Sequence, residues 1–250
     1  MSYKTINFFN YKLFIDNLNS IKLDKRLIIN TINPHSYQLA NNDKNFKNAL
    51  IDANILLPDG VGVTKAVFLL TGKWINKIAG MDVHNYLLKK ANKKKLKCFY
   101  LGSNNKTLSL IKNRIAKEFN NVIIETYSPP YKDKFSKTDN EIIYNKVNNF
   151  CPDVLFVGMT APKQEKWVFN NKDKINAKVI CSIGAVFDFY AGTIKRPGKF
   201  WIKIGMEGIV RLLKEPKRLW KRFFLSDIPF MFFIFKESFL NIFTKKYVKN

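Results

Sequence analysis

The chain has 250 residues, of which 46% are apolar and 25% charged, and this composition excludes a disordered or collagen-like chain. The length suits one large α/β domain or two small ones. The three widely spaced cysteines and two histidines exclude a disulfide framework and a histidine-based zinc site. A net charge of +24 points to a polyanionic partner, which is a nucleic acid, an anionic lipid or a phosphorylated substrate.

Short apolar runs alternate with helical patterns along most of the chain. The runs that predict strands cover residues 26–29, 55–57, 97–101, 122–126, 154–157 and 179–183. Between them the sequence predicts one helix from Asn33-Pro34 towards residue 50 and another through residue 119. Two more helices are predicted, one opening at a Thr138–Glu141 capping box and one after Pro162. This alternation predicts an α/β fold with a mostly parallel sheet and helices on both of its faces.

Small or polar residues follow five of the predicted strands. Ligands of parallel sheets bind outside the carboxyl ends of the strands, so we expect these residues to line one crevice. They are Thr31, Asn33, Asp59, Gly60, Gly102, Gly158 and Gly184.

The C-terminal part of the chain differs from the rest in charge. Residues 195–250 contain 14 Lys or Arg against four Asp or Glu, a net charge of +10. A helix that restarts at Pro216 would place Leu219, Trp220, Phe223 and Phe224 on one arc and Lys217, Arg218, Lys221 and Arg222 on the opposite arc. With the IPFMFFIF run that follows, this pattern fits either an interfacial membrane segment or a helix packed on the core. We expect a core of residues 1–194 and a basic helical appendage of residues 195–250.

The sequence contains no pattern typical of a signal peptide and no run of 18 apolar residues. We therefore expect a cytoplasmic protein that touches the membrane.

Several segments carry the informative motifs of the chain. They are TIN at 31–33, PDGVGV at 58–63, GMD at 80–82, LG at 101–102, PDVLFVGMTAPKQEKW at 152–167, IGAVFDFYAG at 183–192 and GMEGIVRLLKEPKRLWKRF at 205–223. Together and in this order they resemble the WecG/TagA/CpsF family of glycosyltransferases. The PKQE, FDFYAG and RLLKEPKR segments make the resemblance specific because they occur in one chain.

The resemblance implies an activity and its partners. It implies transfer of an N-acetylmannosamine-type sugar, with inversion, from a UDP-sugar to a polyprenyl-diphosphate-linked N-acetylglucosamine. The work would be done at the inner face of the cell membrane, in assembly of teichoic acid, enterobacterial common antigen or capsule. It also implies a Rossmann-like core, no metal or cofactor, and an appendage that contacts the membrane surface and completes the site. A homo-oligomer is left open.

The resemblance also implies catalytic residues. An inverting transfer needs a base that removes the proton of the attacking hydroxyl, and Asp59 matches the base proposed for the family, although Asp before Gly is common in turns. Thr31 and Asn33 match a TxN element that would bind sugar hydroxyls or the leaving phosphate, and Asn33 would also cap a helix. Gln164 matches the Gln of PKQE, and its amide suits an N-acetyl or hydroxyl group.

Further positions are candidates for binding. Backbone amides at Gly102, Gly158 and Gly184 would approach the pyrophosphate of UDP, unless these glycines only form turns. Glu165 either binds substrate or complements a helix dipole, and Asp188 either binds ribose or sugar hydroxyls or caps a turn.

Three arginines are candidates for phosphate binding. Arg211, Arg218 and Arg222 match arginines of the family's appendage, and a guanidinium binds phosphate in a bidentate way. They are three of only six arginines in the chain, so their clustering is informative, although a solvated basic face would also contain them.

The chain departs from the family pattern at three places, one of which is Thr160-Ala161, where family members often have Gly-Ser. Lys77 stands where the family usually has an arginine, so a bidentate contact would be lost there. Gly184-Ala185 stands where the family has two glycines. These changes are compatible with activity and would mark a different sugar donor.

Two other functions compete with a sugar transferase. The basic tail fits a nucleic-acid-binding protein, but its basic residues lie opposite the Trp/Phe arc instead of alternating with stacking aromatics. A nucleotide-dependent oxidoreductase would need a GxGxxG motif after a strand, and the sequence has none.

Overall fold

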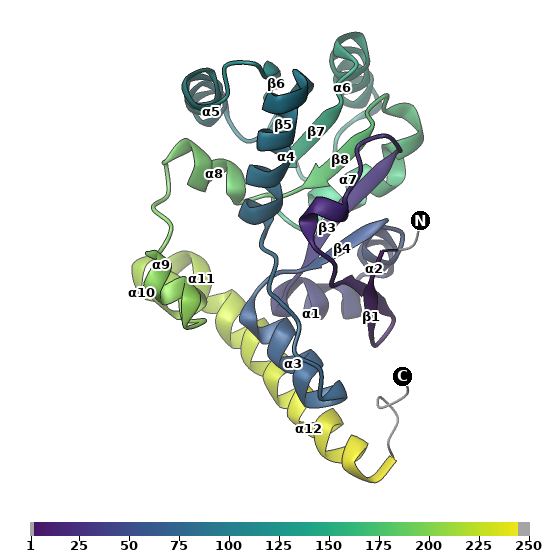
Figure 1. Cartoon of the computed structure of the whole chain (residues 1–250), viewed down its shortest axis with the longest axis vertical. Coiled ribbons are helices and arrows are strands. Elements are labelled where there is room, and N and C mark those ends of the chain that lie inside the picture. Colours follow the sequence, from purple (N-terminus) through teal and green to yellow (C-terminus); the bar gives the residue numbers. More distant parts are fainter. Residues whose placement is uncertain (1–2, 245–250) are drawn as a thin grey trace.

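An eight-stranded sheet forms the centre of the computed structural model, which describes residues 3–244 (Figure 1). The strand order is β1-β2-β4-β3-β8-β7-β5-β6. Only the first pair, β1 with β2, is antiparallel, and every other neighbouring pair is parallel. The mostly parallel α/β sheet expected from the sequence is therefore confirmed. The strands are β1 (Thr5–Phe8), β2 (Tyr11–Phe14), β3 (Leu27–Ile32), β4 (Ile55–Pro58), β5 (Lys97–Gly102), β6 (Ile123–Tyr127), β7 (Val154–Gly158) and β8 (Val179–Ser182).

Twelve α-helices surround this sheet within the described residues. They are α1 (Pro34–Asn42), α2 (Lys44–Ile51), α3 (Val61–Thr71), α4 (Gly80–Lys94), α5 (Asn105–Glu118), α6 (Lys137–Phe150), α7 (Lys163–Asn171), α8 (Val186–Ala191), α9 (Lys199–Lys203), α10 (Glu207–Lys214), α11 (Pro216–Arg222) and α12 (Ile228–Thr244). Short 3₁₀ turns η1 (Leu18–Ser20) and η2 (Lys172–Lys174) and a π-helical turn η3 (Phe223–Asp227) complete the elements.

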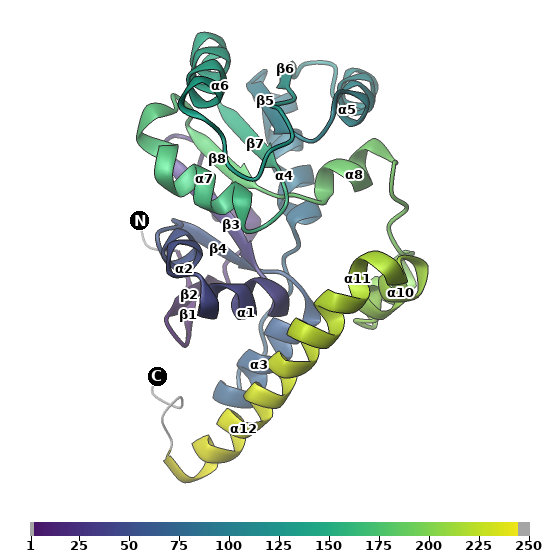
Figure 2. The same ribbon diagram turned by 180° about the vertical axis from the view of Figure 1, so that it is seen from behind.

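The helices cover both faces of the sheet, as expected. Side chains alternate along a strand, so Leu27 and Ile29 of β3 face one side and Ile28 faces the other. Helices α4, α5 and α8 pack on the first face, and α6 and α7 pack on the second (Figures 1 and 2). Helices α1, α2 and α3 enclose a further apolar cluster near the β1–β2 hairpin.

The helix expected from Asn33 towards residue 50 is two helices. The Asn33 side chain caps α1 as predicted, because its oxygen accepts a hydrogen bond from the backbone N–H of Ser36 at 3.0 Å. The chain breaks at Asp43, whose side chain accepts a hydrogen bond from the N–H of Phe46 at 2.9 Å. An aspartate that can cap a new helix therefore interrupts the first one.

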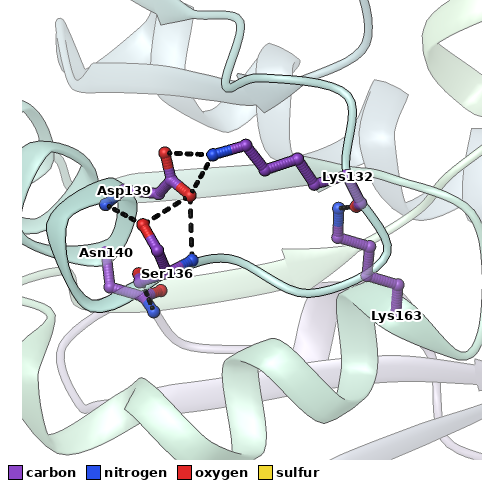
Figure 3. A network of polar contacts seen from close by, with 5 residues as sticks. All are labelled: Lys132, Ser136, Asp139, Asn140 and Lys163. Carbon is purple, nitrogen blue, oxygen red and sulfur yellow. Dashed lines mark hydrogen bonds and ion pairs between the residues drawn. The ribbon is translucent and has the colours of Figure 1, made fainter.

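The capping box expected at Thr138 and Glu141 lies two residues earlier. Ser136 is the N-cap of α6: Asp139 N–H donates to its hydroxyl at 3.1 Å, and its own N–H donates to the Asp139 carboxylate at 2.8 Å (Figure 3). Both Ser136–Asp139 and Thr138–Glu141 have the right spacing. The ion pair of Asp139 with Lys132, at 2.9 Å, favours the first.

The C-terminal helices form an arm that lies beside the sheet. Helices α9, α10 and α11 cluster beyond α8, and α11 continues through η3 into α12, which runs along α3 (Figures 1 and 2). Phe230 and Ile234 of α12 are fully buried against the cluster that contains α3. This face of α12 packs on the core, while Phe232 is 71% exposed on another face.

Neither of the two alternatives for the tail therefore describes α12 completely. The division at residue 195 stays a prediction, and residues 245–250 of the expected appendage lie outside the described residues. Within residues 3–244, every helix is too short or too polar to cross a bilayer.

Candidate active site

The first three catalytic candidates meet at the carboxyl ends of β3 and β4. Ile32 pairs with Pro58 across these strands, and the N–H of Asp59 donates to the carbonyl of Ile32 at 2.9 Å. Thr31 lies inside β3 and not after it, because the strand continues three residues beyond the predicted run. The structure thus brings Thr31, Asn33 and Asp59 to one edge of the sheet.

Asp59 is partly buried there, and its protonation is perturbed. Burial is the largest cause that raises the pKa of Asp59, to about 6, and the negative charge of Glu207 adds to it. The positive charges of Lys77, Arg222 and Arg196 oppose the rise. A carboxylate with a pKa near neutrality is still mostly ionised at pH 7 and is a stronger base than an ordinary aspartate.

Three charged side chains next to Asp59 join the core to the appendage. Glu207 of α10 accepts hydrogen bonds from Lys77 Nζ at 3.1 Å and from Arg196 Nε at 2.9 Å. Burial alone would raise the pKa of Glu207, but Arg196 and Lys77 outweigh it and hold this pKa below its ordinary value. Glu207 therefore stays ionised and keeps both cations in place.

The sequence analysis missed this cluster. Lys77 was expected to lose a contact, yet it forms an ion pair with a residue 130 positions away. Arg196 and Glu207 were not singled out. Arginine is rare in this chain, so the presence of Arg196 could have pointed to this cluster.

The predicted arginines are brought together only in part. Arg211 and Arg222 line the same small hollow between α10, α11 and η3. The guanidinium of Arg211 stacks 5.0 Å from the centre of the Phe189 ring, and its buried Nε has no hydrogen-bond partner. Arg218 is exposed outside the lining of this hollow and forms an ion pair with Glu215 at 2.6 Å.

Arg222 connects this hollow to Asp59. Its charge acts to lower the pKa of Asp59, Asp227 and His35, so it lies close to all three. His35 Nδ1 lies 2.8 Å from the hydroxyl oxygen of Ser226 in η3, which holds the arm against α1. Burial is the main cause that lowers the pKa of His35, to about 4, so its ring is neutral at pH 7. Arg222 therefore lies near both the hollow and the strand end that carries Asp59.

Gln164 and Glu165 form a buried pair at the start of α7. Gln164 Oε1 accepts from the N–H of Met159 at 3.1 Å, and its Nε2 donates to Glu165 Oε1 at 2.8 Å. Both side chains are less than 5% exposed, and Glu165 Oε2 has no partner. Burial raises the pKa of Glu165 to about 7 against these hydrogen bonds. The amide of Gln164 is therefore fixed in one orientation.

The predicted glycines have structural reasons of their own. A Cβ at Gly158 would lie 2.4 Å from the ring of Phe187, so glycine is needed for packing. Gly102 has φ +106°, and a Cβ there would lie 2.7 Å from the carbonyl oxygen of Gly158. At Gly184, φ is +39° and a Cβ would lie 3.3 Å from Gln164 Oε1. Phosphate binding by these backbones stays a prediction.

Asp188 makes a turn contact, and its binding of ribose or sugar hydroxyls stays a prediction. The hydroxyl of Thr193 donates to its carboxylate at 3.3 Å, after α8 has ended. Among residues 3–244, no three His, Cys, Asp or Glu side chains are placed to hold a metal ion.

Comparison with known proteins extends these observations. The sequence profile of the Glycosyl transferase WecG/TagA/CpsF family matches residues 5–242. A Bacillus subtilis (strain 168) protein is 31% identical over 231 residues, which are 92% of this chain and 88% of the relative. A Staphylococcus aureus (strain MW2) protein is 28% identical over 230 residues, 92% of this chain and 86% of the relative. Both are named N-acetylglucosaminyldiphosphoundecaprenol N-acetyl-beta-D-mannosaminyltransferase.

Proposed function

The chain belongs to the WecG/TagA/CpsF family of glycosyl transferases, and from this we propose that it transfers an N-acetylmannosamine-type sugar. The donor is a UDP-sugar, and the acceptor is N-acetylglucosamine linked through a diphosphate to a polyprenol. The shared name of the relatives supports the acceptor and the transferred sugar. The observation that carries the proposal is the position of Asp59, at a strand end and within the field of Arg222 and Arg196.

In this proposal Asp59 is the general base. The acceptor hydroxyl oxygen forms a bond to the anomeric carbon while the bond from that carbon to the phosphate oxygen of UDP breaks. The electron pair leaves with UDP, and the Asp59 carboxylate takes the hydroxyl proton. A base whose pKa lies near the working pH combines a useful ionised fraction with a strong drive to accept that proton.

Further residues bind and orient the substrates. Thr31 and Asn33 lie beside Asp59 and contact sugar hydroxyls, and the fixed amide of Gln164 recognises an N-acetyl or hydroxyl group. Arg211 and Arg222 supply positive charge for a diphosphate, which prefers the bidentate guanidinium group.

Exposed apolar side chains on the arm support a membrane-facing surface. Between 40% and 75% of each of these side chains is exposed: Phe200, Trp201, Ile204, Ile209, Leu213, Trp220, Phe224 and Leu225. Isolated exposed apolar residues are ordinary, but eight within 26 positions favour an interaction surface on this part of the arm. The neighbouring Lys217 and Lys221 are exposed and would attract anionic lipid headgroups. We propose that this surface binds the inner face of the cell membrane, where the acceptor lies.

A donor screen tests the proposed function. Purified protein is mixed with a short-chain polyprenyl-diphosphate N-acetylglucosamine, a panel of UDP-sugars and EDTA, and product masses are measured. A disaccharide from a UDP-N-acetylmannosamine-type donor is expected. If folded protein gives no product with any donor, the proposal is wrong. The names of the relatives give no support to the nucleic-acid-binding alternative.

A further inference from the structure

Two hollows meet on the arm, and they share Phe223 and Asp227 of η3. The first is the hollow that contains Arg211 and Arg222. The second continues along α12 and is lined, besides the shared pair, by Ile228, Met231, Phe232 and Phe235. A hollow that contains two arginines therefore borders an apolar one.

The apolar hollow is built from a second stripe on α12. Positions 228, 231, 232 and 235 recur at helical spacing and lie on one face of the helix. Phe230 and Ile234 anchor a different face to the core, so the stripe is not needed for that packing. Phe232 and Phe235 are nevertheless 71% and 55% exposed. Exposed aromatic rings at a hollow are typical of a ligand site.

We propose that the apolar hollow holds the first isoprene units of the lipid-linked acceptor while Arg211 and Arg222 hold its diphosphate. The inference rests on the proposed function and adds a subsite to it. In a polyprenyl diphosphate the isoprene chain is bonded directly to the phosphate, so its binding surface must begin where the phosphate site ends. Phe223 and Asp227 form that junction.

This arrangement would cover the part of the acceptor's isoprene chain that leaves the bilayer. The acceptor's N-acetylglucosamine must reach Asp59 while its diphosphate lies at Arg211 and Arg222, so the first part of the isoprene chain has to leave the bilayer. If that part were uncovered, its apolar surface would be exposed to water, at a free-energy cost of about 25 cal/mol per Å². The stripe on α12 covers it, and Arg222 connects the same region to Asp59.

Asp227 is the one carboxyl group in the shared lining of the two hollows, and as an anion it would repel a diphosphate. Its Oδ1 is buried and has no hydrogen-bond partner. Burial raises the pKa of Asp227, although the charge of Arg222 opposes this rise. The protonated acid can donate a hydrogen bond to a phosphate oxygen, so this group favours a bound diphosphate once it holds a proton.

A binding experiment without catalysis tests the subsite. Isothermal titration of the full chain in EDTA compares farnesyl diphosphate, which has three isoprene units, with inorganic diphosphate. We expect the farnesyl compound to bind at least about tenfold more tightly, because burying part of an isoprenoid is worth more than 1.4 kcal/mol. Equal affinity for the two probes would overturn the proposal.

Variants identify the surface responsible. Phe235→Ala is expected to remove most of the farnesyl advantage and to leave inorganic diphosphate binding unchanged. Phe239→Ala is the matched control, because Phe239 lies one turn further along α12 and is 62% exposed but does not line the hollow. Arg222→Ala is expected to weaken both probes. If both phenylalanine variants lose the farnesyl advantage equally, the effect comes from non-specific apolar binding along α12, and the subsite is contradicted.

The same variants distinguish the subsite from the bilayer and from the proposed activity. If Phe235→Ala lowers sedimentation with anionic lipid vesicles but leaves farnesyl diphosphate binding intact, the stripe contacts only the membrane and the inference is wrong. The titration needs no sugar donor, so the two proposals can fail separately. If the protein binds farnesyl diphosphate selectively but transfers no sugar, the subsite is supported and the proposed transferase activity is wrong.

Discussion

Replacing Glu207 with glutamine changes the charge next to Asp59 while keeping the size of the side chain. Glu207 raises the pKa of Asp59, whereas Lys77 and Arg196, both hydrogen-bonded to Glu207, lower it. In Glu207→Gln the two cations lose their counter-charge, so the pKa of Asp59 is expected to fall. For charges roughly 8 Å apart at an effective dielectric constant of about 20, the change is about 2 kcal/mol, or somewhat more than one pKa unit.

The pH profile of sugar transfer measures this change. With the pKa of Asp59 at about 6, about one tenth of this base is ionised at pH 5 in the natural protein. If its pKa falls to about 5 in Glu207→Gln, about half is ionised at that pH. The acid side of the kcat/KM profile should therefore move down by about one pH unit, while the maximal rate falls modestly because the base is weaker.

Lys77→Gln is the matched control. It breaks the same 3.1 Å ion pair, but it removes a positive charge, so it should raise the pKa of Asp59 and move the acid side upwards. Simple loosening of the arm would affect both variants alike. Shifts in the same direction, or no shift in either, would refute the electrostatic reasoning.

Three further changes test other parts of the site. Asp59→Asn should lower the rate of transfer by about 10²–10⁴-fold with nearly unchanged UDP affinity, and a near-normal rate would exclude Asp59 as the base. Burial raises the pKa of Glu165 from 4.5 to about 7, so the folded chain keeps a proton that the unfolded chain releases. Stability should therefore fall by an amount of order 3 kcal/mol as pH rises from about 4.5 to 7, and Glu165→Gln should remove this fall in chemical denaturation. Gly158→Ala should lower the free energy of unfolding by about 1–3 kcal/mol, and with it the melting temperature, because its Cβ would lie 2.4 Å from the ring of Phe187. An unchanged melting temperature would show that the ring moves freely.

The parallel sheet and its carboxyl edge were predictable from local patterns. Buried parallel strands are continuous apolar runs, and short runs ending in glycine or a polar residue marked six of them. The β1–β2 hairpin was missed because each of its strands has only four residues, too few to show a period. Strand β3 was predicted too short because Asn30, although buried, interrupts the apolar run.

Site residues were predictable where they stand inside a recognisable motif. They were not predictable where charged residues far apart in the sequence form ion pairs. Asp59 and Gln164 stand inside recognisable segments. The partnership of Lys77 with Glu207 spans 130 positions and depends on how α10 meets the core, which no local pattern encodes. The dual character of α12 was also hidden, because helical periodicity identifies an apolar face without identifying the surface that covers it.

The π-helical turn of η3 sets the angular phase between the two ends of one long helix. Ile228 N–H bonds to the carbonyl of Phe223, five residues earlier, so this turn contains one residue more than an α-helical turn. Each residue advances an α-helix by about 100°, so the extra residue rotates the face that carries Arg222 relative to the face that buries Phe230. Deleting the exposed Leu225 would restore a regular helix and leave two choices. In the first case, Phe230 stays buried and Arg222 turns away from Asp59. In the second case, Arg222 keeps its position and α12 no longer packs on α3.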